Sequence, residues 1–183
     1  MPRCFWCNED PLYIAYHDQE WGVPLRDAQK LFELLLLEGF QAGLSWITIL
    51  KKRARYREVM FGFDVHKVAH MTDDHLEKLM LDPGIIRNRL KLNAARRNAR
   101  AWLAQEDPVK WLWSFVGGVP ITNHFKDRSE VPAITPEAES MSKALSKAGF
   151  TFVGPTICYA FMQASGMVMD HTQECDRYAV LAR

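Results

Sequence analysis

Thiols and imidazoles gather near both ends of this 183-residue chain. Cys4, Cys7 and His17 lie near the start, and His171 and Cys175 lie near the end. Structural zinc sites take four tetrahedral Cys and His ligands, and residues four apart share one face of a helix. Spacing alone favours Cys4 with Cys7 in a Cys3His site, while Cys4, His17, His171 and Cys175 form a Cys2His2 alternative. A third interpretation is buried, unbonded thiols with solvated imidazoles, because the spacing matches no standard finger.

Glu38 is a carboxylate at the end of an apolar helix. It follows four leucines, at positions 34–37, which cover every side of a helical turn, so we expect this helix end to be buried. A carboxylate there opposes the helix dipole, and burial without a partner destabilises it further. Such residues are retained where they bind something. The alternatives are an ion pair with a nearby Arg and a side chain that faces solvent.

Several aromatic residues occur in the same third of the chain as Glu38. Stacked aromatic rings beside a hydrogen-bonding carboxylate suit a planar base that carries positive charge. They suit an ordinary hydrophobic core equally well, so the cluster does not separate a binding site from a core. The residues are Trp6, Tyr13, Tyr16, Trp21 and Trp46.

The composition is that of a globular protein, with 48% hydrophobic and 25% charged residues. The 23 Lys and Arg nearly balance the 22 Asp and Glu, so nucleic-acid binding requires basic residues gathered on one face rather than a high total charge. No apolar run approaches the roughly 20 residues of a membrane span, and the start lacks the apolar stretch of a secretion signal. We therefore expect a cytoplasmic protein whose Cys residues are reduced and available to a metal.

Helix signals recur along the chain and strand signals are almost absent, which predicts an all-α fold with two helical lobes in one domain, residues 1–183. Asp27, Thr72 and Thr135 are expected helix caps, and Pro136 and Pro155 suit first helical positions. Residues 1–25 are predicted to be irregular, and residues 117–135 to form a polar loop that is the best candidate for a mobile segment. The expected helices cover 27–37, 44–60, 72–81, 85–104, 108–116, 135–149 and 155–166.

Residues 137–165 are predicted to form a helix, a tight turn at 150–154 and a second helix. Gly154 and Pro155 mark a helix start, where free backbone N–H groups attract an anion such as a DNA phosphate. Lys143 and Lys147 on the preceding helix add positive charge. The same spacing fits an ordinary αα-hairpin, a common unit of helical proteins. The spacing therefore leaves both interpretations open.

Four long stretches of the sequence together resemble the bacterial 3-methyladenine DNA glycosylase I family. They are DPLYIAYHDQEWGVP (10–24), LEGFQAGLSWITILKKR (37–53), GIIRNRLK (84–91) and LSKAGFTFVGPTICYAFMQASGMVMDH (145–171). The resemblance spans nearly the whole chain. It implies a helix–hairpin–helix DNA glycosylase fold in which one structural zinc ion joins segments 1–20 and 168–178. The family's ligands match Cys4, His17, His171 and Cys175, which makes Cys7 a bystander.

The resemblance also implies a pocket for the damaged base. Glu38 is its catalytic and substrate-binding carboxylate, and aromatic residues complete its walls. Asp170 lies beyond the second helix of the hairpin and adjoins His171, so we expect it to orient that imidazole rather than to act on the substrate. The aromatic pocket residues are Trp46 and Tyr16, with Tyr13 and Trp6 as further lining.

Two segments of the sequence are expected to contact DNA because they match the family's DNA-binding parts. The loop at residues 42–44, with Gly43 and Leu44, is expected to press into the duplex near the extruded nucleotide. The hairpin match covers residues 149–156, in which Gly154 and Thr156 are the expected contacts.

The implied function is excision of 3-methyladenine from alkylated double-stranded DNA. The enzyme extrudes the damaged nucleotide from the duplex and hydrolyses its N-glycosidic bond, which leaves an abasic site and free 3-methyladenine. We expect a monomer that associates with the bacterial nucleoid when it acts, and no strand cleavage. Two rivals come from other classes: a zinc-containing helical module that binds DNA or RNA without catalysis, and a structural protein whose aromatic cluster is only core.

Overall fold

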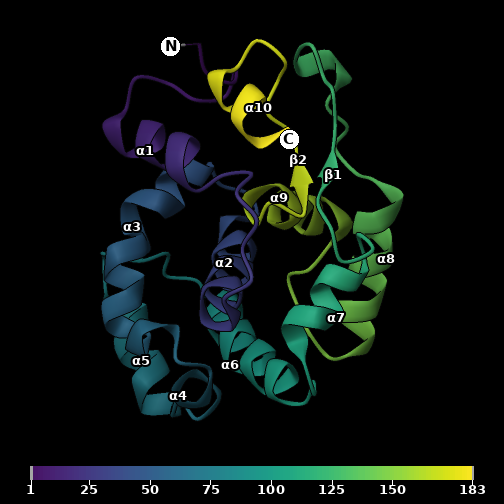
Figure 1. Ribbon diagram of the computed structural model, residues 1–183. Helices are drawn as coiled ribbons and strands as arrows, with labels where there is room; N and C mark the ends of the chain where they lie inside the picture. Colours follow the sequence, from purple (N-terminus) through teal and green to yellow (C-terminus); the bar gives the residue numbers. More distant parts are fainter. Residues whose placement is uncertain (1, 183) are drawn as a thin grey trace.

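The computed structural model describes residues 2–182 of the chain, which form a largely helical fold (Figure 1). The predicted all-α fold is confirmed. Within the described residues its one departure is a pair of two-residue strands. In order, the elements are α1 (Pro11–Gln19), α2 (Ala28–Gln41), α3 (Trp46–Val59), η1 (Phe61–Phe63), α4 (Val65–Ala69), α5 (Asp73–Leu81), α6 (Arg89–Leu103), α7 (Pro108–Ser114), β1 (Ile121–Thr122), η2 (Arg128–Glu130), α8 (Pro136–Lys147), α9 (Pro155–Ala164), β2 (Val168–Met169) and α10 (Asp176–Leu181).

Side-chain caps determine where most helices begin. The carboxylate of Asp27 accepts a hydrogen bond from the backbone N–H of Lys30, and the hydroxyl of Thr72 accepts one from His75. Each cap satisfies an N–H group that has no partner within its own helix. Thr135 caps α8 in the same way, with Pro at the first helical position. The predicted starts at these three residues are confirmed.

Two predictions about element positions are wrong. Residues 1–25 are not irregular throughout, because Asp10 caps α1 and Pro11 occupies its first turn. Asp followed by Pro is a helix-start signal that the composition of this aromatic-rich segment obscured. The basic helix begins at Arg89 rather than near residue 85, because Asn88 caps it and accepts a hydrogen bond from the backbone N–H of Lys91.

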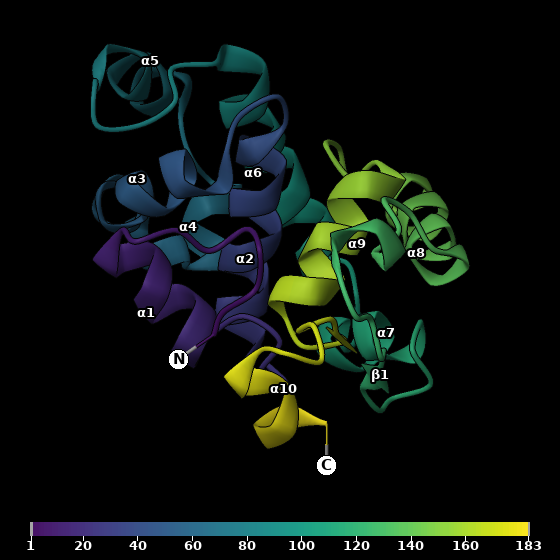
Figure 2. The same cartoon turned by 90° about the horizontal axis from the view of Figure 1, so that it is seen from above.

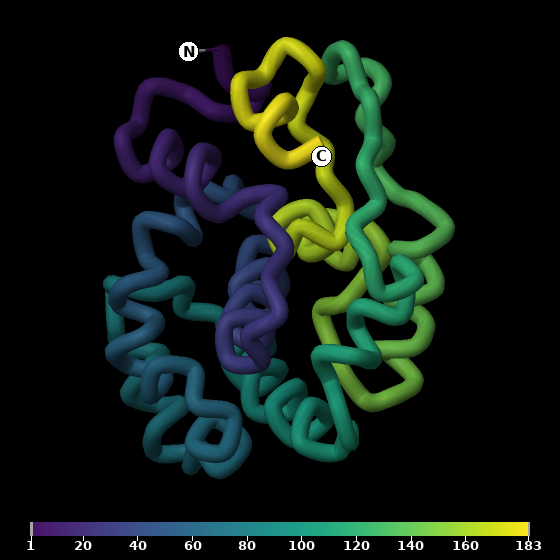
Figure 3. The backbone as a smooth tube through the Cα atoms, in the orientation of Figure 1, coloured from purple at the N-terminus to yellow at the C-terminus, as the bar shows by residue number. Residues whose placement is uncertain are grey.

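Helix α2 lies at the centre of the molecule. Every residue from 31 to 40 is buried, and the helix contacts α3, α6, α7 and α9. Helices α3, α4 and α5 lie on one side of it and α7 and α8 on the other (Figures 1 and 2), and the backbone tube shows the same arrangement (Figure 3). Each fully buried Leu stabilises the fold by roughly 1.5–3 kcal/mol. The helix that carries Glu38 is therefore held in place by the packing of its leucines.

The segments near the two ends of the chain lie side by side (Figures 1 and 2). Asp176 N–H donates a hydrogen bond to the carbonyl of Pro2 at 3.1 Å. The strands β1 and β2 pair in parallel, Ile121 with Val168 and Thr122 with Met169. This pairing anchors the chain just before His171. Within residues 2–182 no helix is long and apolar enough to cross a membrane.

Gly166 lies against the backbone of Val23 and Pro24. Its φ is +68°, and an added Cβ would sit 2.4 Å from the carbonyl carbon of Val23. We expect Gly166→Ala to lower the free energy of unfolding by on the order of 3 kcal/mol, from left-handed backbone strain plus the clash. Gly117→Ala is the matched control, because Gly117 has φ +69° and open space around it. In urea unfolding, Gly117→Ala should lower the free energy of unfolding by only about 1 kcal/mol. Equal losses in the two variants would contradict the close contact between Gly166 and Val23.

Candidate metal centre and active site

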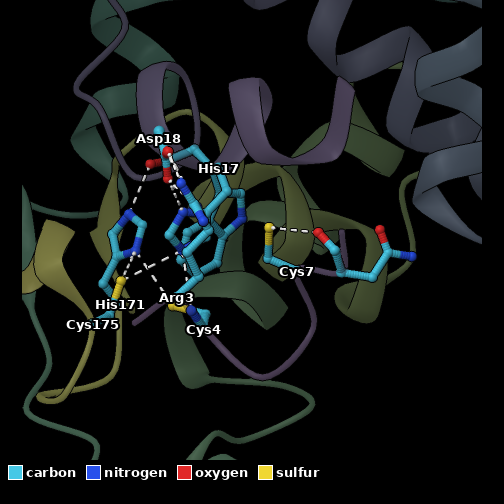
Figure 4. A network of polar contacts seen from close by, with 9 residues as sticks. Arg3, Cys4, Cys7, His17, Asp18, His171 and Cys175 are labelled. Atoms are coloured by element: carbon cyan, nitrogen blue, oxygen red, sulfur yellow. Dashed lines mark hydrogen bonds and ion pairs between the residues drawn. The ribbon is translucent and has the colours of Figure 1, made fainter. Parts of the chain in front are cut away.

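Cys4, His17, His171 and Cys175 converge at one point, where their ligand atoms all lie within 4.8 Å of one another (Figure 4). The sulfur of Cys175 is 3.5 Å from Nε2 of His17 and 3.4 Å from Nδ1 of His171. A tetrahedron with metal–sulfur bonds of ~2.3 Å and metal–nitrogen bonds of ~2.0 Å has sulfur-to-nitrogen edges of about 3.5 Å. The four side chains are buried and have the spacing of a tetrahedral metal site.

The four candidate ligands come from separate segments of the chain. Cys4 precedes α1, His17 lies on α1, His171 follows β2, and Cys175 is the residue before α10. His171 and Cys175 do not share a helical face. A turn brings them together instead, in which Cys175 N–H donates to the carbonyl of Thr172 at 2.8 Å.

Hydrogen bonds orient both imidazoles with unprotonated nitrogens toward the sulfurs. Nδ1 of His17 donates to Asp18 at 2.7 Å, and Arg3 holds that carboxylate through three contacts of 2.7–3.1 Å. Nε2 of His171 donates to the carbonyl of Trp21 at 3.0 Å. The ring nitrogens that face the sulfurs, Nε2 of His17 and Nδ1 of His171, therefore carry lone pairs. The backbone N–H of Cys4 donates to Nε2 of His17 at 3.2 Å, as a lone pair there allows. Such outer contacts are typical of metal-binding His.

One of the two thiols is already in the charge state that suits a cation. Cys4 donates a hydrogen bond to the sulfur of Cys175, which lowers the pKa of Cys175 well below its usual range and raises the pKa of Cys4. The thiolate is the metal-binding form of Cys. Cys7 lies outside this centre, where its thiol contacts the carbonyl of Asn8 at 3.7 Å (Figure 4). The Cys3His alternative with Cys7 is therefore wrong.

Asp170 does not orient His171, so that prediction is also wrong. Its two carboxylate oxygens accept hydrogen bonds from three neutral side chains on other elements. Asp170 is 2% exposed and lines a cavity instead. Its donors are Asn123 at 2.7 Å, Tyr159 at 2.5 Å and Gln163 at 2.8 Å.

Glu38 and Trp46 face a cavity of about 300 Å³. Glu38 lies three residues before the end of α2, and Trp46 is the first residue of α3. Both are buried, and neither the Glu38 Oε2 nor the Trp46 Nε1 has a hydrogen-bond partner within residues 2–182. Buried polar atoms normally have partners. One acceptor and one donor are therefore free for a ligand.

The predicted aromatic residues surround this cavity. Tyr16 lies 5.4 Å from Trp46, between ring centroids, and Trp6 lies 5.1 Å from Tyr13. Trp6 also packs edge-on against Trp21 at 4.9 Å. Ring pairs at these distances and angles stabilise one another beyond simple burial.

This aromatic wall continues into the metal centre. Trp21 contacts the ring of His171 at 4.6 Å, and Trp6 contacts the ring of His17 at 5.2 Å. A metal that holds the two imidazoles thereby also holds the back of the cavity wall.

Burial raises the pKa of Glu38 to about 8, from an ordinary value of 4.5. Desolvation is the cause, since removal from water disfavours the charged form. The carboxyl group of Glu38 is therefore mostly protonated at neutral pH when nothing else occupies the cavity. A positively charged ligand beside it would favour the ionised form.

The cavity has further lining that the sequence did not reveal. Gln41 comes from the end of α2, Gln163 from α9, and residues 131–133 from the loop before α8. These residues come from distant segments, so no local pattern marks them. Asp170 carried one signal, because an acidic residue next to a metal ligand indicates a polar role, but not which one.

All four expected DNA-contacting residues are exposed, and one of them lines the cavity. Gly43 and Leu44 are exposed between α2 and α3. Gly154 is the exposed residue before α9, and Thr156 in the first turn lines the cavity. Helices α8 and α9 are joined by a short turn, so the predicted succession of a helix, a turn and a second helix is present.

Comparison with known proteins gives consistent similarities. A family model described as methyladenine glycosylase matches residues 6–178. DNA-3-methyladenine glycosylase 1 of Escherichia coli strain K12 is 53% identical over 182 residues, 97% of each chain. A crystal structure of 3-methyladenine DNA glycosylase I has 51% identity and a TM-score of 0.94, covering 96% of this chain and 98% of the other. A variant of 3-methyladenine DNA glycosylase I in complex with 3-methyladenine has 38% identity and a TM-score of 0.92, covering 96% and 97%.

Proposed function

The chain belongs to the methyladenine glycosylase family, whose members are hydrolases acting on N-glycosyl bonds, and on this premise we propose that it removes 3-methyladenine from double-stranded DNA by base flipping. The observation that carries the proposal is the unpartnered carboxyl of Glu38, buried beside Trp46 in a cavity of about 300 Å³. Extrusion of a nucleotide costs a few kcal/mol and places the base where such a cavity can enclose it.

Glu38 selects the base by hydrogen bonding and by charge. Its free oxygen accepts a hydrogen bond from the exocyclic amine of adenine. In DNA, methylation at N3 makes the base cationic, and an adjacent cation lowers the raised pKa of Glu38, so the carboxyl ionises on binding. An unmethylated, neutral base leaves the buried carboxyl without this compensation. The cavity therefore favours the cationic methylated base over the neutral one, because a buried polar group that lacks a compensating partner is penalised.

Trp46 and Tyr16 hold the plane of the base. The indole and phenol rings both line the cavity and lie 5.4 Å apart between centroids. Stacking on an aromatic ring contributes about 1–3 kcal/mol per base, and the ring face attracts a cation. These contacts favour the methylated base over water in the cavity.

Hydrolysis replaces the N-glycosidic bond by a bond to water. The bond from C1′ to the base nitrogen breaks with both electrons passing to the base, which leaves neutral. Water adds to C1′ and loses a proton, which gives an abasic site. Positive charge develops on the sugar, and the Glu38 carboxylate stabilises it electrostatically. No Lys lines the cavity in the described part of the chain, so the proposal includes no strand cleavage.

The DNA is held by two exposed backbone segments. The turn before α9 offers N–H groups of a helix start to a phosphate, as in a helix–hairpin–helix motif. The Gly43–Leu44 turn presses against the duplex beside the extruded nucleotide. Leu44 is 41% exposed, which suits an apolar side chain that replaces the lost base stacking.

The metal is proposed to be one structural zinc ion held by Cys4, His17, His171 and Cys175. The two sulfurs, the two nitrogen lone pairs and the tetrahedral spacing fit zinc. When bound, it cross-links the two end segments and takes no part in bond cleavage. The four residues hold the cavity wall through Trp6 and Trp21.

A base-release assay tests the proposal. We expect the purified protein to release free 3-methyladenine from methylated duplex DNA and to leave abasic sites, both measured by chromatography. Trp46→Ala should lower the rate by on the order of 10- to 100-fold, because it removes the stacking surface. The control is Trp111→Ala, since Trp111 packs against Phe115 and lies outside the cavity. Binding of DNA with no base release would favour the non-catalytic alternative.

A further inference from the structure

Lys91 is a buried lysine that bonds to the end of α2. It lies on α6 and is only 6% exposed. Its ammonium group donates to the carbonyl of Phe40 at 2.8 Å and to the carbonyl of Ala42 at 2.6 Å. The carbonyls of a helix C-terminus lack partners within the helix and carry partial negative charge. Lys91 supplies both a donor and a positive charge at this place.

The segment that Lys91 binds is a type II turn. Ala42 has φ −43° and ψ 115°, and Gly43 has φ +80°. Leu44 N–H donates to the carbonyl of Gln41 at 2.6 Å and closes the turn. Type I and type II turns differ mainly in the orientation of the central peptide, here the one between Ala42 and Gly43. The carbonyl of that peptide is the one that Lys91 holds.

The 41–44 turn lies between Glu38 and Trp46, two of the residues that line the base cavity. Glu38 lies just before it on α2, and Trp46 lies just after it on α3. The turn also carries Gly43 and Leu44 at the surface. Its conformation therefore determines where Leu44 stands relative to the cavity.

Helix α6 also holds the other proposed DNA-contacting segment. The amide of Asn98 donates to the carbonyl of Thr151 at 2.9 Å and accepts from its N–H at 2.8 Å. Arg97 donates to the carbonyl of Gly149 at 3.0 Å. One helix thus bonds the backbone of both the 41–44 turn and the 149–154 turn.

We infer that Lys91 is a positioning residue that keeps the 41–44 turn in the type II form and so aims Leu44 at the duplex. This inference rests on the proposed function and deepens it. Lys91 does not line the cavity and does not touch the base. Its action is on the approach of DNA, separate from recognition of the base.

The test compares Lys91→Met, which keeps the length of the side chain but removes its donors, with Lys91→Arg, which keeps the charge. In Lys91→Met we expect a loss of on the order of 10- to 100-fold in the single-turnover rate on methylated duplex DNA. Affinity for a duplex with a stable abasic analogue should fall about tenfold as well. The dissociation constant of free 3-methyladenine, followed by Trp fluorescence, should stay unchanged, as should the midpoint of the pH profile. Lys91→Arg should recover most of the rate.

Arg100→Met is the matched control. Arg100 lies on the same helix and donates to the carbonyl of Ala69, at the end of α4, at 3.0 Å. It removes the same kind of contact at a place remote from the turn, and it should leave all these quantities unchanged. An equal loss in Arg100→Met would overturn the inference, because the effect would then be general stability. So would a loss of free-base affinity that matches the loss of rate.

Hydrogen exchange of the Leu44 amide tests the turn without any substrate. Exchange should be faster in Lys91→Met than in the unsubstituted protein, and Arg100→Met should match the latter. Unchanged exchange in Lys91→Met overturns the inference, whatever the base-release assay gives. A protein that releases no 3-methyladenine at all overturns the proposed function, and the exchange measurement still decides the role of Lys91.

Discussion

Glu38→Gln is expected to stabilise the fold increasingly as the pH rises from 5 to 8. The pKa of Glu38 is about 8 in the folded protein and about 4.5 when exposed, so folding takes up a proton between these values. The wild-type fold has its full stability below pH 4.5 and loses stability up to pH 8. The loss approaches on the order of 4 kcal/mol at pH 8 and about 1 kcal/mol at pH 5. Gln does not ionise and escapes this loss.

Urea unfolding at pH 5, 6.5 and 8 measures the effect. The difference between the two proteins should grow by on the order of 3 kcal/mol across this range. Glu33→Gln is the matched control, because Glu33 lies on the same helix but is paired with Arg57 at 2.8 Å. It should give no such gain. A Glu38→Gln difference that is equal at pH 5 and pH 8 would contradict a buried, unpaired carboxyl.

The same substitution should lower base release by on the order of 100-fold. Gln keeps the shape of the side chain and an acceptor oxygen, but it cannot become negative beside a cationic base. The combination of a more stable fold with lower activity separates this result from damage to the structure. Normal release by Glu38→Gln would remove this residue from the mechanism.

Cys175→Ala is expected to remove the bound metal and to destabilise the protein by several kcal/mol. Structural zinc contributes on the order of 10 kcal/mol of apparent binding free energy in small zinc-dependent domains. Only part of that is expected here, because α2 has its own packed core. Metal analysis should give about one zinc per chain before the substitution and little after it. Thermal unfolding should shift down in parallel, as it should when a chelator is added to the unsubstituted protein.

Cys7→Ala provides the control for the metal centre. Cys7 is close in sequence to Cys4, but its thiol lies outside the cluster and contacts the carbonyl of Asn8. Its removal should leave both the zinc content and the unfolding temperature unchanged. Loss of zinc from Cys7→Ala, or full zinc content in Cys175→Ala, would show that the ligand set is wrong.

Local chemistry made much of the helical pattern predictable. Thr72 and Thr135 are caps whose effect depends on residues only three positions away. The buried end of α2 followed from four consecutive leucines. Helix α1 shows the limit of this reasoning, because its capping signal at Asp10 was present but its surroundings favoured an irregular segment.

The site was less accessible to sequence reasoning, because its contacts join remote residues. The choice between Cys7 and His17 as a ligand came from family resemblance, since spacing favoured the wrong pair. Asp170 was assigned to its sequence neighbour, whereas its partners are Asn123, Tyr159 and Gln163 on other elements. No periodicity reveals that a lysine in the basic helix is buried against residues about fifty positions earlier.

The joining of Cys4 to Cys175 has a consequence for the order of events during synthesis. The centre cannot close until residue 175 has been made, by which time nine of the helices in residues 2–182 have already been translated. Contacts between positions so remote in the sequence form slowly. The proposed zinc ion would therefore enter the centre as a late event, after most of the helices have been made, and would hold together segments that packing has already brought close.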